Sequence, residues 1–428
     1  MAADMIARGI GLAEVARQKR LRILNTLRTS IERTGYRLPQ LDTTLPTIGI
    51  AAAATAIATG TSWQVSVSGT PALHAAKYTF LGGTWANNST TFPDTEAYRP
   101  FTYHAGNGTD PTTNFVQGVG RVRFSTAAPK LELWVKEGAT GGGHGFRMQV
   151  DGKLAKAGVI GVGSSNFRFI PVTWGDGTAA FRKNRNYELE FGPVGQFCGI
   201  RTEPIYSPEP WPQADGLRVV VHGDSLLQTI VDTGSLDTPS WGGMGAVIGN
   251  LIGQADTWVS GVGGSGWFNS GVGTKSTFNQ RVALDVVAPA PDVVIEMGGG
   301  NDFALATQST LQAAVESWLA TVIGANPNII IFMIGPLTCA AWSAANNWAR
   351  DAKKAAAAKY PRNVAFIDSP AEGWTFGLGK QGATNNSGNT DWVLSSDAAH
   401  PTIEGHVHLA GRVTRAVAKA IPGLIAAQ

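Results

Sequence analysis

Residues 217–226 read Leu-Arg-Val-Val-Val-His-Gly-Asp-Ser-Leu, and this stretch decides the fold of the C-terminal half. The apolar run from Leu217 to Val221 is nearly continuous instead of alternating, which is typical of a strand buried on both faces of a parallel sheet. Ser225 follows this strand directly, on a glycine-bearing turn that would hold its hydroxyl at the edge of the sheet. A serine hydroxyl is a weak nucleophile that needs an adjacent base. Gly-Asp-Ser is also an ordinary turn sequence, so the tripeptide alone does not establish a catalytic site.

After this strand, short apolar runs alternate with helical stretches. The apolar runs are 257–259, 293–297, 329–334 and 364–367, and the helical stretches are 241–252, 311–323, 346–360 and 403–421. This alternation predicts a parallel sheet covered by helices on both faces. Active sites of such sheets lie at the carboxyl ends of the strands, so the residues that follow each strand are candidates for chemistry.

Two further segments carry polar side chains at informative positions. The run 293–297 ends in Gly-Gly-Gly-Asn-Asp, where Asn301 can direct its amide toward a ligand, although a glycine loop with an Asx turn is a simpler interpretation. Near the C-terminus, Asp397 stands three residues before His400. This spacing lets the carboxylate accept a hydrogen bond from Nδ1 and leaves Nε2 free as a base, although an aspartate at a helix N-cap explains the same sequence.

In this order the three segments resemble the SGNH (GDSL-type) hydrolase superfamily. Its first block matches Gly223-Asp224-Ser225-Leu226, its third matches Gly299-Gly300-Asn301-Asp302, and its fifth matches Asp397 and His400 followed by Pro401. The second block usually reads Asn-x-Gly-x-x-Gly, but Val259 stands where the asparagine is expected. Gly261 is the best match for the glycine of this block, and a register shifted by two would select Gly263. The resemblance covers about half of the chain, from Leu217 to the end.

The resemblance implies a flavodoxin-like three-layer α/β domain that hydrolyses esters. Ser225 would be the nucleophile, His400 the general base and then the acid, and Asp397 the group that orients the imidazole. The implied oxyanion hole consists of the backbone N–H groups of Ser225 and Gly261 and the side chain of Asn301.

Two more acids of the matched blocks, Asp224 and Asp302, would mainly organise their loops. No metal and no cofactor are expected. His406 and His408 stand two residues apart on an expected helix, so they point to different sides and make poor joint ligands.

From about Asp42 to Ile205 the pattern is that of β-strands. Alternation with period two, or a short run, marks strands at 121–124, 130–136, 146–150, 167–170 and 187–191. Asp151-Gly152 predicts a hairpin turn after the third of these. Many short strands between Gly-, Asn- and Thr-rich turns predict an all-β sandwich of the jelly-roll kind. Four tryptophans could stack on sugar rings, although core packing is the more ordinary use of each: Trp63, Trp85, Trp134 and Trp174.

The expected organisation has three parts. Residues 1–40 form a basic amphipathic helix or arm, residues 41–205 the β-sandwich, and residues 206–428 the hydrolase domain. Between the last two, residues 207–212 read Ser-Pro-Glu-Pro-Trp-Pro. Their prolines exclude a helix and a central strand, which predicts a stiff linker.

The N-terminal part differs from the rest in charge. Residues 1–40 hold eight Lys or Arg and three Asp or Glu, a net +5, whereas the whole chain of 428 residues carries +3. Apolar residues recur at helical spacing between Leu12 and Ile31, and Gly35 is expected to follow the helix end. The helix could be a targeting sequence, a nucleic-acid arm or a docking helix. Packing on its own body or on a partner chain is the plainest interpretation, and a homo-oligomer or a virion assembly could form through it.

Composition excludes several classes. The balanced total charge argues against a dedicated nucleic-acid binder, and the absence of a long apolar stretch argues against a membrane span. No secretory h-region stands at the N-terminus, so we expect a cytoplasmic or virion-associated protein. Cys198 and Cys339 are too few for a disulfide framework and are interpreted as buried thiols.

The leading functional hypothesis is a carbohydrate O-acetyl esterase, because a β-sandwich ahead of an SGNH domain is similar to the arrangement in polysaccharide-deacetylating esterases. The partner would then be an acetylated carbohydrate or polysaccharide. One alternative is a lipase-like or thioesterase enzyme acting on longer acyl chains. Another is a sugar-binding phage tail or adhesin module, and the basic helix with a Gly/Thr/Asn-rich β half resembles phage tail-associated esterases.

Overall fold

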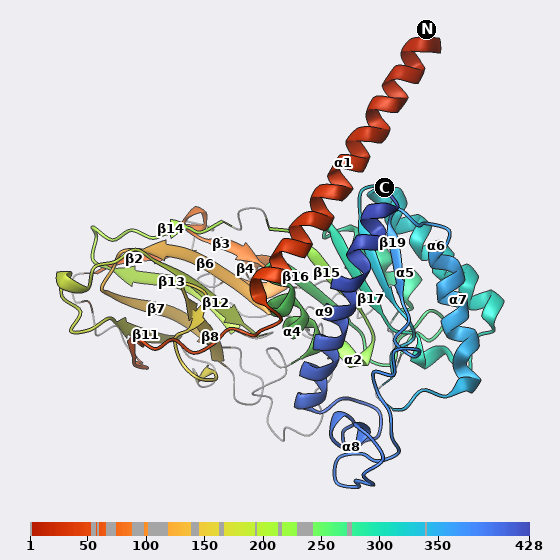
Figure 1. Cartoon of the computed structure of the whole chain (residues 1–428). Helices are drawn as coiled ribbons and strands as arrows, with labels where there is room; N and C mark the ends of the chain where they lie inside the picture. Colours follow the sequence, from red (N-terminus) through yellow and green to blue (C-terminus); the bar gives the residue numbers. More distant parts are fainter. Residues whose placement is uncertain are drawn as a thin grey trace.

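The computed structural model describes residues 2–52, 57, 60–65, 74–87, 98–101, 119–137, 145–161, 167–192, 195–212, 216–228, 243–271, 276–338 and 340–428. Figure 1 shows a β-rich half beside a helix-covered sheet, with a long N-terminal helix, α1 (Ala2–Thr34). Cys198 is buried, as expected. Cys339 and the beginning of the expected helix 241–252 lie outside the described residues.

Two antiparallel sheets form the β-rich half. The first has the order β1 (Thr47–Ile48), β11 (Phe167–Thr173), β7 (Lys130–Glu137), β13 (Gly195–Thr202), β5 (Tyr98–Phe101) and β4 (Thr84–Asn87), with β2 (Thr61–Gln64) also paired to β13. The second has the order β10 (Ile160–Gly161), β8 (Gly145–Val150), β12 (Arg185–Phe191), β6 (Gly120–Thr126) and β14 (Glu209–Pro210), with β3 (Thr79–Leu81) on β6 and β9 (Lys153–Leu154) on β8. Two 3-10 turns, η1 (Ala75–Lys77) and η2 (Ala179–Phe181), connect strands.

The two sheets share one core. Leu133 of β7 and Val122 of β6 are fully buried in the same apolar cluster, so the sheets pack face to face as a sandwich. The five strands predicted from the sequence are all present. The predicted hairpin is confirmed as well, because β8 and β9 pair across Asp151-Gly152 and both turn residues have positive φ. The jelly-roll connectivity stays a prediction.

The four tryptophans of this half are engaged in packing. Trp174 is buried and the rings of the other three are half-buried. The indole nitrogens of Trp63, Trp85 and Trp174 donate to Thr202 Oγ1 (2.8 Å), the Leu81 carbonyl (3.0 Å) and Tyr187 Oη (2.9 Å), and Trp134 stacks on Phe169. Packing therefore accounts for these rings without a sugar.

Among the strands that sequence reasoning missed, the longest is β13, between β7 and β5, and one edge strand was misread as linker. β13 does not alternate, because the register shifts between Phe197 and Gly199 and this irregularity resets the pleat. Part of the predicted linker, Glu209–Pro210, is strand β14 on the edge of β6. An edge tolerates proline, so this segment is tied to the sandwich instead of standing free.

The C-terminal half is built on a parallel sheet in the order β16 (Thr257–Gly261), β15 (Val219–Gly223), β17 (Val293–Met297), β18 (Ile330–Ile334) and β19 (Val364–Ile367). The helices are α2 (Ser225–Gln228), α4 (Met244–Ile252), α5 (Phe278–Val282) running into the π-helical turn η3 (Ala283–Val287), α6 (Gln308–Ala325), α7 (Asn347–Ala357), α8 (Thr390–Val393) and α9 (Ile403–Ala426), with short turns η4 (Gly300–Asp302) and η5 (Ala344–Asn346). None of the described helices is both long and apolar enough to cross a bilayer.

Helices cover both faces of this sheet, which confirms the three-layer prediction. Val219 and Val221 lie in one apolar cluster with side chains of α1, α4 and α9. Val220, between them, lies in the other cluster with side chains of α5, α6 and α7. This alternation explains why the strand sequences are apolar throughout, since each of these strands is buried on two sides.

The second half of α1 belongs to the core of the α/β domain. Leu24 and Leu27 are 0% exposed and lie among side chains of α4 and α9. Leu12, by contrast, is 72% exposed, and Figure 1 shows the N-terminal part of the helix extending away from the body. Packing on its own body is thus confirmed for the second half, and the helix ends at Thr34, directly before Gly35, where the sequence predicted its end.

Polar contacts join the sandwich to the α/β domain. The Arg121 guanidinium of β6 donates to the Ala255 carbonyl (2.8 Å) and to Asn250 Oδ1 (2.9 Å). The Gly82 N–H donates to Asp256 Oδ1 (3.0 Å). These groups lie before β16, at the amino end of the parallel strands, which is the edge opposite to the expected site.

Candidate functional site

Ser225 stands at the carboxyl end of β15, the strand between β16 and β17, where the sequence predicted it. Gly223 ends the strand, and a Cβ there would come within 2.1 Å of the Met297 carbonyl oxygen, so only glycine permits this approach to β17. Ser225 then begins α2, and Asp224 caps this turn by accepting from the Leu226 N–H (3.1 Å). The sharp turn holds the serine at the edge of the sheet.

Asp397 and His400 are brought together in the loop before α9. The imidazole Nδ1 lies 2.6 Å from Asp397 Oδ2, while Asp397 Oδ1 accepts from Ser395 Oγ (2.6 Å) and from the Ala399 and His400 N–H groups. Partial burial acts to raise the pKa of Asp397, but the hydrogen bonds from His400 and Ser395 outweigh it and hold this pKa well below its usual range. The ionised carboxylate fixes Nδ1 and leaves Nε2 as the basic nitrogen.

No hydrogen bond joins Ser225 to His400 among the described residues. Their elements are connected through α4, which contacts both α2 and α9, and the Met244 N–H of α4 donates to His406 Nδ1 (3.2 Å). The Asp397–His400 pair is therefore formed while Ser225 stands apart from it.

Asn301 follows β17 and faces the loop after β16. Its Nδ2 donates to the Ser265 carbonyl (2.9 Å) and lies 3.5 Å from Asp224 Oδ2. One of the two amide hydrogens is thus held by Ser265, and the second has only a long contact. This geometry anchors the amide between the loop after β16 and the turn that carries Asp224.

The acids of the first and third blocks organise their loops, in keeping with the roles that the resemblance implied. Asp302 is fully buried and accepts three successive backbone N–H groups, those of Trp267, Phe268 and Asn269, at 2.8–3.0 Å. Asp224 is also buried, and this burial raises its pKa to about 6.

The glycines of the second block lie at the end of β16. Gly261 is the last residue of the strand and pairs with Gly223, and the next residue, Val262, donates its N–H to the Gly223 carbonyl (3.4 Å). Gly263 lies two residues further on, in the following loop. Both glycines are therefore beside the end of the strand that carries Ser225.

Sequence reasoning missed two buried cations beneath this edge. Arg281 of α5 and Lys353 of α7 are both 0% exposed and are paired with Asp285 (2.7 Å) and Glu296 (2.8 Å). The i,i+4 spacing of Arg281 and Asp285 within an apolar run was the available signal.

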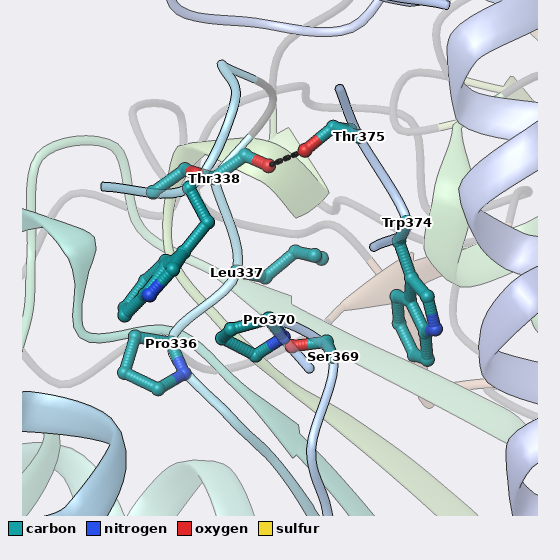
Figure 2. A pocket seen from close by; sticks show the side chains of 8 residues that line it. Pro336, Leu337, Thr338, Ser369, Pro370, Trp374 and Thr375 are labelled. Atoms are coloured by element: carbon teal, nitrogen blue, oxygen red, sulfur yellow. Dashed lines mark hydrogen bonds between the residues drawn. The ribbon is translucent and has the colours of Figure 1, made fainter. Parts of the chain in front are cut away.

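A small depression lies beyond β18 and β19. Figure 2 shows it between the loop Pro336–Thr338 and the loop Ser369–Thr375, which are joined by a hydrogen bond from Thr375 Oγ1 to the Thr338 carbonyl. Its cavity volume of about 10 Å³ is no more than one water molecule needs. It is too small to serve as an acyl tunnel.

The histidines near this edge have partners other than a metal ion. Within the described ranges no group of three or more His, Cys, Asp or Glu side chains is arranged to hold a metal ion. His406 is buried and receives the Met244 N–H, and His408 contacts the Trp374 carbonyl through Nε2 (3.3 Å).

Comparison with known proteins places this domain. Residues 221–407 match the model of the GDSL-like lipase/acylhydrolase family. Comparison with curated protein sequences finds no match. The family match spans the segments with Ser225, Asn301 and the Asp397–His400 pair.

Solved structures resemble the chain over both halves. A family two carbohydrate esterase from Clostridium thermocellum, an active-site mutant in complex with a cello-oligosaccharide, is 15% identical, with a TM-score of 0.53, covering 79% of this chain and 96% of its own. A carbohydrate esterase family 2 enzyme with a carbohydrate binding domain, from Corynascus thermopiles (Myceliophthora fergusii), is 16% identical, with a TM-score of 0.53. The match covers 82% of this chain and 99% of that enzyme. A salicylyl-acyltransferase from a tetracycline biosynthetic pathway is 13% identical, with a TM-score of 0.53. The match covers 81% of this chain and 97% of the acyltransferase.

At these identities the likeness concerns the fold alone. It extends to the sandwich as well as to the parallel sheet, since about four-fifths of the chain is covered. The family model matches residues 221–407, most of the C-terminal half, and on this match the enzyme class is that of a carboxylic ester hydrolase.

Proposed function

We propose that this hydrolase removes O-acetyl groups from a carbohydrate, with Ser225, His400 and Asp397 as its catalytic residues. The observation that carries the proposal is the 2.6 Å contact between Asp397 Oδ2 and His400 Nδ1, in a domain where Ser225 follows strand β15 by two residues. An imidazole oriented by a carboxylate is what a serine nucleophile needs as a base.

The mechanism follows from these groups. Ser225 Oγ attacks the ester carbonyl carbon while His400 Nε2 takes its proton. The tetrahedral intermediate collapses, the bond to the sugar oxygen breaks, and the imidazolium returns the proton to that oxygen. Water then attacks the acyl-enzyme with His400 again as base, which releases acetate and restores Ser225.

The developing oxyanion would be bound by three donors. They are the backbone N–H groups of Ser225 and Gly261 and the Asn301 amide, which Ser265 already anchors. Each such donor is worth about 3 kcal/mol in the transition state. None of these steps requires a metal, so EDTA is expected to leave the rate unchanged.

The carbohydrate substrate is supported by the comparisons. Two of the similar structures are family 2 carbohydrate esterases, and one was solved with a cello-oligosaccharide. A short acyl group on a sugar fits these comparisons.

The test is an acyl-chain series of aryl esters together with acetate release from acetylated polysaccharide. Acetyl esters should react fastest, octanoyl esters should be nearly inert, and Ser225→Ala should abolish both reactions. Each buried methylene is worth about 0.8 kcal/mol, so a maximum at eight carbons or more would favour the lipase-like alternative. Sugar binding without any ester hydrolysis would favour the tail or adhesin module.

A further inference from the structure

Arg281 is a buried arginine that the proposed chemistry does not use. It lies on the short helix α5, its side chain is 0% exposed, and its charge is balanced by Asp285 one turn later. Burying a charged side chain costs free energy, and replacing a buried ion pair by apolar residues is often neutral or stabilising. Stability alone therefore does not explain why an arginine stands here.

The guanidinium contacts each of the segments that lead to the oxyanion hole. Nη2 donates to the Gly223 carbonyl (2.5 Å), two residues before Ser225. Nη1 donates to Ser260 Oγ (2.8 Å), the residue before Gly261.

The third segment is reached through Ser265. Nη2 lies 3.4 Å from Ser265 Oγ, and the Ser265 carbonyl is the group that anchors the Asn301 amide (2.9 Å). One side chain therefore spans the end of β15, the end of β16 and the loop that holds Asn301.

The orientation of the guanidinium favours these segments over its own carboxylate. Only Nη1 reaches Asp285 Oδ2 (2.7 Å), and Nε has no partner among the described residues. A bidentate pair would direct two guanidinium nitrogens at Asp285. In the observed arrangement only one nitrogen reaches Asp285, and the other hydrogen bonds of the guanidinium go to the ends of β15 and β16 and to Ser265. The flat fork of an arginine can make these contacts together, whereas the single ammonium of a lysine cannot.

We propose that Arg281 is a positioning residue that sets the geometry of the oxyanion hole by fixing the Gly223 carbonyl, Ser260 and Ser265 relative to one another. The inference rests on the proposed function, because it needs Ser225, Gly261 and Asn301 to be the groups that meet the oxyanion. Preorganised donors lose much of their effect when they are displaced by a fraction of an ångström.

The test is Arg281→Lys, which keeps the charge beside Asp285 and removes the fork. We expect kcat on a small aryl acetate to fall by about 100-fold with KM changed by less than about threefold. Phosphonylation of Ser225 by an aryl phosphonate, which needs the same donors, should slow by a similar factor. The assay is run far below the melting temperature of the variant. Under that condition a loss of folding stability alone would not lower kcat while leaving KM unchanged.

The matched control is Arg121→Lys. Arg121 is also a buried, ion-paired arginine (1% exposed), but it bridges to residues before β16 at the other edge of the sheet. Its variant should keep kcat within about threefold of the parent even where the melting temperature falls, because it displaces no catalytic group.

The outcomes separate this inference from the proposed function. An active Ser225→Ala protein would overturn the proposed function and the inference with it. An inactive Ser225→Ala protein beside an Arg281→Lys protein with the parent kcat would overturn the inference alone. If Arg281→Lys does not fold, Ser260→Ala with Ser265→Ala decides: a kcat loss of about tenfold or more supports positioning, and an unchanged kcat overturns it.

Discussion

Buried acid–base pairs occur in both halves of the molecule, but their partners differ. In the sandwich, Glu190 is fully buried and faces two guanidiniums, Arg121 (3.1 Å) and Arg147 (2.7 Å). Burial acts to raise the pKa of Glu190, and the two arginines outweigh it and lower this pKa. The charges of this half are thus satisfied by one another and by the contact with the neighbouring domain.

In the α/β domain, Glu296 is equally buried and faces a single ammonium, that of Lys353 (2.8 Å). Burial raises the pKa of Glu296 to about 7, and Lys353 offsets this only in part. The same ammonium also donates to the Gly298 carbonyl (3.1 Å), at the beginning of the loop with Asn301. Charges here are shared with the backbone of the site, which points to positioning as their use.

The largest effect is expected at the nucleophile. Ser225→Ala should lower kcat by several orders of magnitude, about 10⁶ in the best-studied serine hydrolase, and leave the melting temperature unchanged. Ser125→Ala, which removes a hydroxyl bonded to Asn186 in the sandwich, should not affect turnover. Steady-state rates on an aryl acetate measure both, and more than about a tenth of the parent activity in Ser225→Ala would refute the assignment.

A smaller loss is expected at the carboxylate that orients the base. Asp397→Asn should lower kcat by about 10²–10⁴, because the imidazole loses its fixed tautomer. The pKa of Asp397 lies below its usual range, so Asp397 stays ionised near neutral pH and keeps its hold on His400 Nδ1 there. Steady-state kcat of Asp397→Asn on an aryl acetate tests this, with Asp151→Asn in the sandwich hairpin as the control.

The buried and the exposed parts of helix α1 are expected to differ in their effect on folding stability. Leu27→Ala should lower the free energy of unfolding by about 2–5 kcal/mol, because it opens a cavity in the α/β core. Leu12→Ala, on the exposed part of the helix, should change it by less than about 0.5 kcal/mol. Thermal or denaturant unfolding compares the two, and an equal loss in Leu12→Ala would mean that this part of α1 is covered in solution.

The two glycines after the strand of the second block sharpen the oxyanion assignment. Gly261→Ala should reduce kcat by about tenfold more than Gly263→Ala, because a side chain beside the donor crowds the oxyanion. Both variants are compared at saturating substrate. The opposite ranking would show that the register of this block is shifted by two.

The smallest effect concerns pH and stability. The raised pKa of Glu296 gives stability that is complete below its unfolded value near 4.5 and is lost as the pH rises to about 7. The lowered pKa of Glu190 gives stability above its unfolded value that is lost as the pH falls. Melting temperatures of Glu296→Gln and Glu190→Gln from pH 4 to 8 should therefore diverge from the parent in opposite directions, by about 2–4 °C. Parallel pH profiles would refute the contrast.

Much of the fold was predictable because the spacing of apolar residues along the sequence indicates the strands and helices. Continuous apolar runs marked the parallel strands, and alternation marked β6, β7, β8, β11 and β12. β13 was not predictable, because a register shift at Phe197–Gly199 hides its alternation. Two further expectations stay predictions: that the protein is associated with a phage tail, and that it forms an oligomer through α1.

The sequence by itself determined which side chains follow which strands, and so brought Ser225, Asn301 and the Asp397–His400 spacing to the same edge of the sheet. These features depend on neighbours in the chain, and a motif or a repeat period records them. Only the tertiary structure decided that Leu24 and Leu27 of α1 complete the α/β core and that the Arg281 guanidinium spans Gly223, Ser260 and Ser265. Such contacts join residues 16 to more than 200 positions apart, and no local pattern of hydrophobicity encodes them.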